Sequence, residues 1–223
     1  MNFLKRVRIF FLLSPIILCS CGDSTERKST NLTTDDLIHK GDSCFDIKLY
    51  EDAYNFYHSI LLKDTTDARG LRKLGRVKSI LKENDSAEYY CKRAISIDPK
   101  LPMAHYYLGV VKNEKNEFDS SINEFSLAIK LKKDYWDAYA NRGRVYSKIK
   151  KNTLAFKDFN NVLKNDPYND KALNSRGVLL ASQGRPENAL VDYNQAIRFK
   201  LKEADYYNNR EISIYTCTES TML

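Results

Sequence analysis

The sequence predicts an all-α fold, a solenoid of helix–turn–helix repeats stacked one upon the next. Five of the eight glycines recur every 34 residues with no insertion or deletion between them: Gly41, Gly75, Gly109, Gly143 and Gly177. Apolar residues recur at helical spacing between these glycines, as at Ala87, Tyr90, Cys91, Ala94 and Ile95. A fixed period of this length is the signature of stacked helical hairpins. We call the five residues the ladder glycines.

The length of 223 residues allows one or two domains. The formal net charge is +7, but three basic residues lie in the first eight positions, namely Lys5, Arg6 and Arg8. The remaining charges are of mixed sign along the chain. This falls short of the dense basic stripe that marks a nucleic-acid-binding protein, so no nucleic-acid partner is predicted.

The N-terminus has the pattern of an export signal. Residues 1–8 are basic, and residues 9–18 form an apolar run of ten that contains Pro15. A run of that length matches the core of a signal peptide and is about half of what a membrane-spanning helix needs.

The residues that follow, Leu18-Cys19-Ser20-Cys21, resemble a bacterial lipoprotein signal. The resemblance implies that residues 1–20 are removed and that Cys21 carries the lipid; Cys19 departs from the usual pattern. Residues 21–33 are then a polar, flexible tether, and the predicted location is the cell envelope, anchored in the outer membrane and facing the periplasm or the cell surface. Two alternatives stay open, a secreted protein cleaved in the ordinary way and an uncleaved anchor.

Five units of 34 residues follow, at 34–67, 68–101, 102–135, 136–169 and 170–203, with a ladder glycine at position 8 of each. Position 20 is small: Ala53, Ala87, Ser121, Ala155 and Ala189. Position 24 is aromatic except in the second unit: Tyr57, Cys91, Phe125, Phe159 and Tyr193. Glycine inside a helix costs about 1 kcal/mol relative to alanine, so its recurrence indicates that helices approach closely there.

The pattern of small residues at positions 8, 20 and 27, an aromatic at 24 and proline at 32 resembles the tetratricopeptide repeat. Pro99 and Pro167 supply that proline in two units, whereas Thr65, Lys133 and Leu201 replace it in the others. The resemblance implies a right-handed superhelical solenoid of five repeats. Residues 204–223 begin like a sixth first helix and depart from it at Glu211, so they are predicted to be a capping helix or a partial sixth repeat.

No motif for catalysis, a cofactor or a metal ion was found, and the chain is predicted not to be an enzyme. The three histidines, His39, His58 and His105, fall at different positions of different units, so they are predicted to be surface or packing residues. Cys44 and Cys91 occupy apolar positions and are predicted to be buried structural thiols. The alternative to a non-catalytic protein is an enzyme whose active site has no recognisable sequence motif.

The surface with functional promise is the inner face of the superhelix. By the resemblance, positions 2, 5, 9 and 12 of each first helix line it. The candidate partner-binding residues are Arg69, Arg72, Lys73, Arg76, Met103, Tyr106, Val110, Arg144, Lys171 and Asn174. The chaperone-binding carboxylate clamp of some tetratricopeptide arrays is absent, because Ile38 and Asp42 occupy the relevant positions.

The predicted function is a non-catalytic scaffold or adaptor at the cell envelope. It would bind a protein or peptide, of acidic character, in the concave groove, because arginines bind carboxylates in a bidentate manner. The alternative is an envelope receptor for an anionic ligand such as a glycan or a lipid head group.

The lipid-anchor prediction is tested by the substitution Cys21→Ser. After a high-salt wash, which removes proteins held by charge alone, the variant is expected to leave the membrane fraction. It should keep the helical circular dichroism of the wild type, because the thiol is the predicted lipid attachment site and has no other role. Membrane association that persists through the wash would contradict the anchor.

Overall fold

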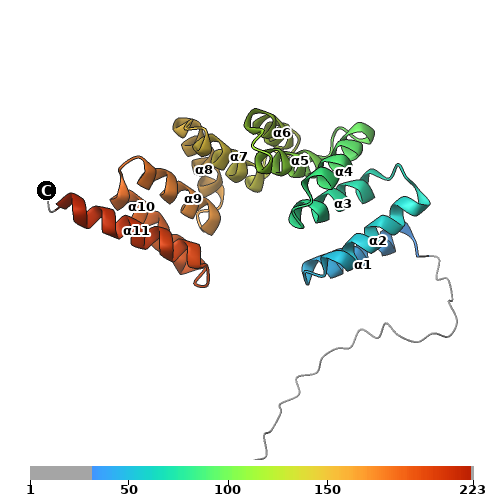
Figure 1. Ribbon diagram of the computed structural model, residues 1–223, viewed down its shortest axis with the longest axis horizontal. Coiled ribbons are helices and arrows are strands. Elements are labelled where there is room, and N and C mark those ends of the chain that lie inside the picture. Colours follow the sequence, from blue (N-terminus) through green and yellow to red (C-terminus); the bar gives the residue numbers. More distant parts are fainter. Residues whose placement is uncertain (1–31, 222–223) are drawn as a thin grey trace, which may run out of the picture. The chain divides into compact units, whose positions relative to one another are not determined.

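The computed structural model describes residues 32–221, without the side chains of Thr216 and of residues 218–221. The predicted signal peptide, the lipidated Cys21 and residues 21–31 of the tether lie outside that range. The part described folds into helices joined by short connections (Figure 1). They are α1 Thr34–Asp46, α2 Tyr50–Lys63, α3 Ala68–Ile80, α4 Asn84–Ile97, α5 Pro102–Glu114, α6 Phe118–Leu131, α7 Trp136–Lys148, α8 Asn152–Asn165, α9 Asp170–Ser182, α10 Pro186–Phe199 and α11 Ala204–Thr221.

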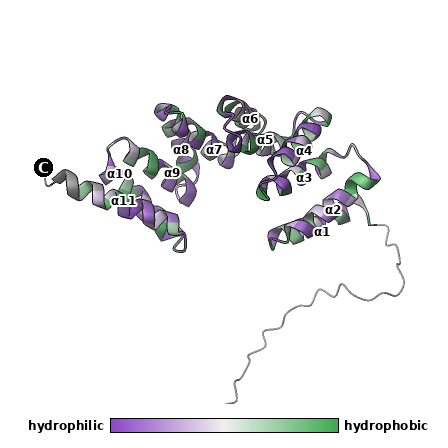
Figure 2. Cartoon of the chain, in the orientation of Figure 1, coloured by the Kyte–Doolittle hydropathy of each residue, from purple (hydrophilic) through white to green (hydrophobic). Residues whose placement is uncertain are grey.

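The helices stack as hairpins in chain order, which confirms the all-α repeat fold. We call α1, α3, α5, α7 and α9 the first helices, and the even-numbered helices the second helices. Each first helix packs on the second helix that follows it, and each second helix packs on the next first helix. Hydrophilic and hydrophobic residues are interleaved along every helix (Figure 2), as expected where one face is buried. Between residues 32 and 221, no helix is long and apolar enough to cross a bilayer.

The array from Thr33 onward is one compact unit. Its first helix begins with a capping box, in which Thr33 accepts from the backbone N–H of Asp36 and the Asp36 carboxylate accepts from that of Thr33. The N–H groups at the start of α1 that lack a partner within the helix are therefore capped from within the array.

Each ladder glycine faces the residue at position 24 of its own unit. A Cβ atom at Gly143 would lie 2.8 Å from the ring of Phe159, and one at Gly75 would lie 2.5 Å from the sulfur of Cys91. The position-24 side chains are fully or almost fully buried. The glycine therefore lets an aromatic ring lie against the backbone of the first helix.

Small residues at positions 20 and 27 complete the contact between the helices. Ala155 and Val162 of α8, like their counterparts in the other units, have no exposed surface. Ser121 replaces alanine at position 20 of the third unit, and its hydroxyl donates to the Gly109 carbonyl at 2.7 Å. A buried hydroxyl is tolerated there because it has this partner.

The turn inside each hairpin has one recurring geometry. The second residue after each first helix has a left-handed backbone, at Lys48, Lys82, Asn116, Lys150 and Gly184. In the fourth unit Lys150 N–H donates to the Ser147 carbonyl and Lys151 N–H to the Tyr146 carbonyl. This is the Schellman motif, which satisfies the last carbonyls of the helix.

Two of the hairpins contain the same buried ion pair. Arg142 of α7 donates two hydrogen bonds of 2.8 Å to Asp158 of α8, and a third of 2.9 Å to Ser126 of the preceding unit. One repeat later, Arg176 binds Asp192 in the same bidentate manner and reaches Asn160. These arginines tie each hairpin to the one before it.

His105 is a buried packing residue whose two ring nitrogens both have hydrogen-bond partners. Its Nδ1 lies 2.7 Å from the carboxylate of Glu124, and its Nε2 lies 3.0 Å from the Pro99 carbonyl. A carbonyl oxygen can only accept, so Nε2 carries a proton and points it at Pro99. The hydrogen bond to Glu124, acting against burial, raises the pKa of His105. The imidazole ring therefore links α5 and α6 to the preceding loop.

Helix α11 packs on α10 and covers the end of the fifth unit. Tyr206 is buried there and donates to Asp170 at 2.6 Å. Unlike the first helices, α11 continues through the point where the turn would come and runs to Thr221. It carries Glu211 where the ladder glycines stand, so a second helix with a ring at position 24 could not pack on it as α10 packs on α9.

The close contact at the ladder predicts the effect of Gly143→Ala. The added methyl group meets the buried ring of Phe159, and overpacking of this kind costs about 1–3 kcal/mol. The higher helix propensity of alanine offsets about 1 kcal/mol of that cost. Because Phe159 is fully buried, a cost in the upper part of that range is expected, which leaves a net loss of about 1–2 kcal/mol in the free energy of unfolding, measured by urea denaturation. Arg144→Ala, at the exposed neighbouring position, is the control; a stability equal to the control would contradict the packing role.

Candidate functional site

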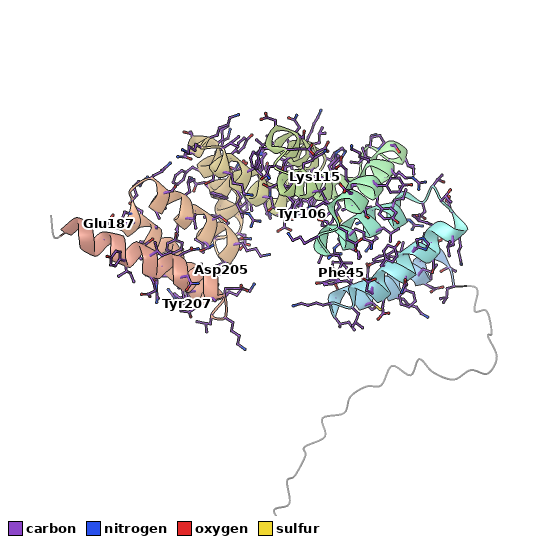
Figure 3. The ribbon with its side chains drawn as sticks, viewed as in Figure 1. Phe45, Tyr106, Lys115, Glu187, Asp205 and Tyr207 are labelled. Atoms are coloured by element: carbon purple, nitrogen blue, oxygen red, sulfur yellow. The ribbon has the colours of Figure 1, made fainter. Side chains whose placement is uncertain are left out.

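The first helices line the inner side of the curved row of hairpins (Figure 1), and Tyr106 of α5 is labelled in Figure 3. Two hollows share Tyr106 as a lining residue. The first hollow measures about 540 Å³ and is lined by Arg76, Pro102, Met103, Tyr106, Tyr107, Lys132, Tyr135, Asp137 and Lys171. The second measures about 350 Å³ and is lined by Tyr106, Val110, Asn113, Glu114, Phe125, Asn141, Arg144 and Lys148. We call the two together the groove.

Three tyrosines form the floor of the first hollow. The ring of Tyr106 lies 5.0 Å from that of Tyr107 and 5.0 Å from that of Tyr135, between ring centroids. Burial raises the pKa of all three hydroxyls, so they stay protonated at physiological pH and can donate hydrogen bonds. Lys132 lies over the ring of Tyr135 at 5.3 Å from its centroid. The floor therefore combines apolar surface with hydroxyl donors.

Arg72 and Arg76 stand at the α3 side of this floor, one helical turn apart. Arg72 donates to the sulfur of Met103 at 3.1 Å, which is a weak acceptor, and burial lowers the pKa of its guanidinium. The guanidinium of Arg76 lies 3.6 Å above the ring centroid of Phe45, and its Nε is buried with no hydrogen-bond partner. Within residues 32–221, neither arginine forms an ion pair with a carboxylate.

The nearest acid, Asp42, already has two partners. Its carboxylate accepts from the buried ammonium of Lys73 and, at 2.5 Å, from the hydroxyl of Tyr57. Although burial raises it, these hydrogen bonds leave the pKa of Asp42 below its usual value. Burial outweighs the same hydrogen bond for Lys73, whose pKa is lowered. Lys73 is thus a structural cation that joins α1 to α3.

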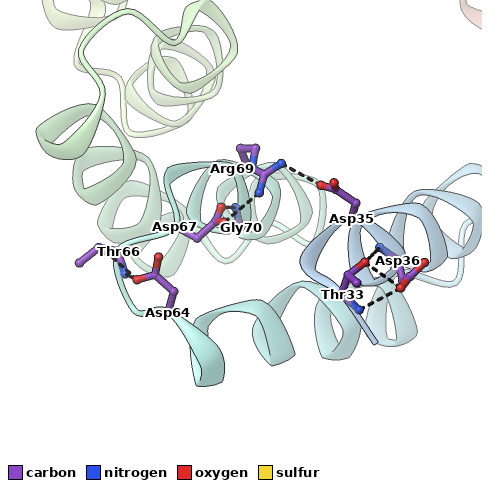
Figure 4. A network of polar contacts seen from close by, with 8 residues as sticks. All are labelled: Thr33, Asp35, Asp36, Asp64, Thr66, Asp67, Arg69 and Gly70. Atoms are coloured by element: carbon purple, nitrogen blue, oxygen red, sulfur yellow. Dashed lines mark hydrogen bonds and ion pairs between the residues drawn. The ribbon is translucent and has the colours of Figure 1, made fainter. Parts of the chain in front are cut away.

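Arg69, on the same helix, is also paired. It donates to Asp35 of α1 at 2.9 Å and to Asp67 at 3.3 Å (Figure 4). Asp67 in turn accepts from the N–H of Gly70 and caps α3. The basic segment at residues 69–76 therefore divides into two cations that hold the first two hairpins together and two that have no carboxylate partner. Of the latter, Arg76 lines the first hollow, whereas Arg72 does not line it and reaches it only through its contact with Met103.

The second hollow is polar at its rim. Asn141 donates to the hydroxyl of Tyr106 at 2.7 Å and accepts from Arg144. Lys148 donates to Asn113 at 3.0 Å. These contacts join α5 to α7 and hold Tyr106 in place between the two hollows.

The remaining predicted residues lie as follows. Arg76, Met103, Tyr106, Val110, Arg144 and Lys171 line the groove. Asn174 accepts from Asn209 of α11 at 3.0 Å, so it joins α9 to α11. Asp137, at position 2 of the fourth unit, also lines the groove, as the repeat pattern predicts, whereas sequence reasoning missed Tyr107, Lys132 and Tyr135. These three lie outside the positions that the repeat pattern assigns to the inner face.

The described residues that line the groove include no cluster of side chains that could bind a metal ion. Across residues 32–221, no three His, Cys, Asp or Glu side chains come together as a metal ion would require. Burial raises the pKa of the Cys91 thiol to about 12, which suits a structural role against Gly75. What the groove can offer a ligand is therefore the set of aromatic, hydroxyl and cationic side chains given above.

This architecture defines a protein built of superhelical helix–turn–helix repeats, with a concave surface on its first helices. The fold is that of a tetratricopeptide-repeat array. The family model described as tetratricopeptide repeat matches residues 137–169. The solved structures named below share its fold at low sequence identity.

Three similar proteins illustrate this. The tetratricopeptide repeat domain-containing protein PYG7 of Arabidopsis thaliana is 33% identical over 116 residues; the match covers 50% of this chain and 38% of that protein. The chain thus spans well under half the length of this relative. YrrB, described as having an unusual peptide-binding site, superposes with a TM-score of 0.61 at 18% identity, covering 82% of this chain and 94% of YrrB. PilW, a type IV pilus biogenesis factor, gives 0.70 at 16% identity, covering 83% and 91%.

The role of Asp42 predicts that Asp42→Asn destabilises the array. The substitution leaves the ammonium of Lys73 buried without a counter-ion, with an expected loss of about 1–3 kcal/mol in the free energy of unfolding. Asp35→Asn is the matched control, because Asp35 also accepts from a cation of α3 but is 84% exposed; a change within about 0.5 kcal/mol is expected. Equal effects of both substitutions in urea denaturation would contradict the structural role of Lys73.

Proposed function

We propose that this protein is a non-catalytic adaptor that captures an acidic peptide segment of a partner protein in its groove at the bacterial cell envelope. The observation that carries the proposal is the pair Arg72 and Arg76. Arg76 lines the first hollow, Arg72 contacts the lining residue Met103, and within residues 32–221 neither arginine has a carboxylate partner. Other buried or half-buried cations of the array have one, as Lys73, Arg142 and Arg176 do.

The chemistry of the hollow fits a carboxylate next to an apolar side chain. Guanidinium groups bind carboxylates through paired hydrogen bonds, and desolvated cations gain most from such a partner. The tyrosine floor offers a rigid surface for an aromatic or aliphatic anchor of the kind found in binding hot spots. Lys132 and Lys171 at the rim add positive charge, and exposed Asp137 is the one acid among the described residues that line this hollow.

The comparisons support the peptide as the class of ligand. Tetratricopeptide-repeat arrays generally act as protein–protein interaction scaffolds, and YrrB is described by its peptide-binding site. The envelope location is supported by the resemblance of residues 18–21 to a lipoprotein signal. It also agrees with the role of PilW, a protein of this fold that acts in the biogenesis of type IV pili.

The test measures binding of defined probes to residues 32–223. A fluorescent peptide panel, in which aspartate or glutamate flanks a tyrosine or phenylalanine, is compared with the same peptides carrying asparagine or glutamine instead. The acidic peptides are expected to bind more tightly. Arg72→Gln together with Arg76→Gln is expected to raise the Kd at least about tenfold, because two charge-assisted hydrogen-bonding partners are lost.

Arg69→Gln is the matched control, since Arg69 lies on the same helix and is already occupied by Asp35 and Asp67. Its effect on the Kd is expected to stay below about threefold, in line with an exposed pair. Sulfated glycan fragments and soluble lipid head groups form a second set of probes. Tight binding of these, with no binding of the acidic peptides, would replace the adaptor by an anionic-ligand receptor.

A further inference from the structure

A second surface of interest lies on the connections at the C-terminal end of the array. Tyr168, in the connection between α8 and α9, is 67% exposed. Phe199, at the end of α10, and Leu201, in the next connection, are 46% and 68% exposed. The rings of Tyr168 and Phe199 meet edge to face, with centroids 4.8 Å apart. We call these three residues the apolar tip.

Basic residues lie within a few positions of the apolar tip in the sequence. Lys164, Arg198 and Lys202 are exposed, and none of the three forms an ion pair with another residue of the stretch 32–221. Along residues 198–202 the sequence alternates basic and apolar side chains, as Arg-Phe-Lys-Leu-Lys. The apolar tip therefore stands among cations that are available to an outside partner.

Three of the acids nearby already have partners, whereas Asp205 of α11 is exposed. Asp166 accepts from the side chain of Asn169 at 3.0 Å, and Asp170 accepts from the hydroxyl of Tyr206 at 2.6 Å. Glu203 pairs with Lys200 at 2.7 Å. These three carboxylates are thus held against the array, while Arg198 and Lys202 are exposed with no acid of the described array bound to either.

We propose that the apolar tip inserts into the interface of an anionic lipid bilayer. Aromatic side chains favour the head-group region of a membrane, and lysines and arginines beside them are attracted to anionic lipids. The pattern is that of interfacial binding, in which apolar side chains enter the boundary and cations remain at its surface. Three side chains on two connections are also fewer than the roughly 20–30 residues a side that a stable protein interface takes.

The position of the apolar tip in the fold agrees with this use. It lies on the edge of the array from which the first helices begin, since residues 166–169 and 200–203 connect a second helix to the following helix. The chain enters the array on the same edge, at Thr33 ahead of α1. The surface is separate from the groove, and its binding requires neither the peptide partner nor a lipid on Cys21.

The experiment uses residues 32–223, whose array is the compact unit and which lacks the predicted lipid anchor. Co-sedimentation is measured with vesicles of phosphatidylcholine alone and with vesicles that also contain phosphatidylglycerol. Binding is expected to the anionic vesicles and to weaken as salt is raised. Phe199→Ser with Leu201→Ser is expected to lower the partition coefficient at least about tenfold.

Ile47→Ser with Leu49→Ser is the matched control, because these side chains are 68% and 48% exposed on a turn of the first hairpin. Their loss is expected to leave vesicle binding unchanged. Arg198→Gln with Lys202→Gln is expected to weaken binding to the anionic vesicles about fivefold per charge, with no effect on phosphatidylcholine.

Absence of binding to the anionic vesicles, or an equal loss in the control pair, would overturn the proposal. A dimer detected by sedimentation velocity would also overturn it if Phe199→Ser with Leu201→Ser abolished that dimer. The apolar tip would then be covered by a second copy of the chain. Peptide binding in the groove is measured on the same variants and is expected to be unchanged, so that failure here and failure of the proposed function are distinguishable.

Discussion

The contact between a ladder glycine and the side chain at position 24 is the constraint on which the rest of the array depends. It sets how closely the two helices of a hairpin approach, as at Gly143 and Phe159. That spacing in turn allows the small residues at positions 20 and 27 to bury completely. Because one hairpin cannot bury both of its faces, the same spacing must hold in every unit for the next hairpin to fit. The second unit keeps the approach with a sulfur in place of a ring, at Cys91.

Charge is distributed over this frame in two ways. Most buried cations hold hairpins together, as Arg142 does with Asp158 and as Lys73 does with Asp42. Such pairs offset the cost of removing a charge from water only when both partners are present. Arg72 and Arg76 differ because the array gives them a thioether and an aromatic ring in place of a carboxylate. The structure therefore separates cations that are paired with a carboxylate of the stack from two arginines that are not.

The repeat pattern predicted the fold because it is written in local spacing, with glycine at position 8 and small residues at 20 and 27. The partners of the charged side chains were not predictable in the same way. Arg69 and Arg72 lie one turn apart and read alike in the sequence, yet Arg69 meets Asp35 from a unit 34 residues away. Tyr135 was missed for a similar reason, since it belongs to the end of one unit and becomes part of the floor only when the next hairpin turns over it. Contacts between units depend on the stacking, which the spacing within a unit does not specify.

The turn inside each hairpin has a consequence for how such a chain can change its length. Lys48, Lys82, Asn116, Lys150 and Gly184 share one backbone conformation although their side chains differ. A turn defined by main-chain hydrogen bonds does not depend on the identity of its neighbours. A whole unit could therefore be gained or lost by duplication or deletion within the coding sequence without any turn being redesigned. The difficult positions in such an event are the side chains that reach across unit boundaries, such as Arg142 to Ser126, which would meet a new neighbour.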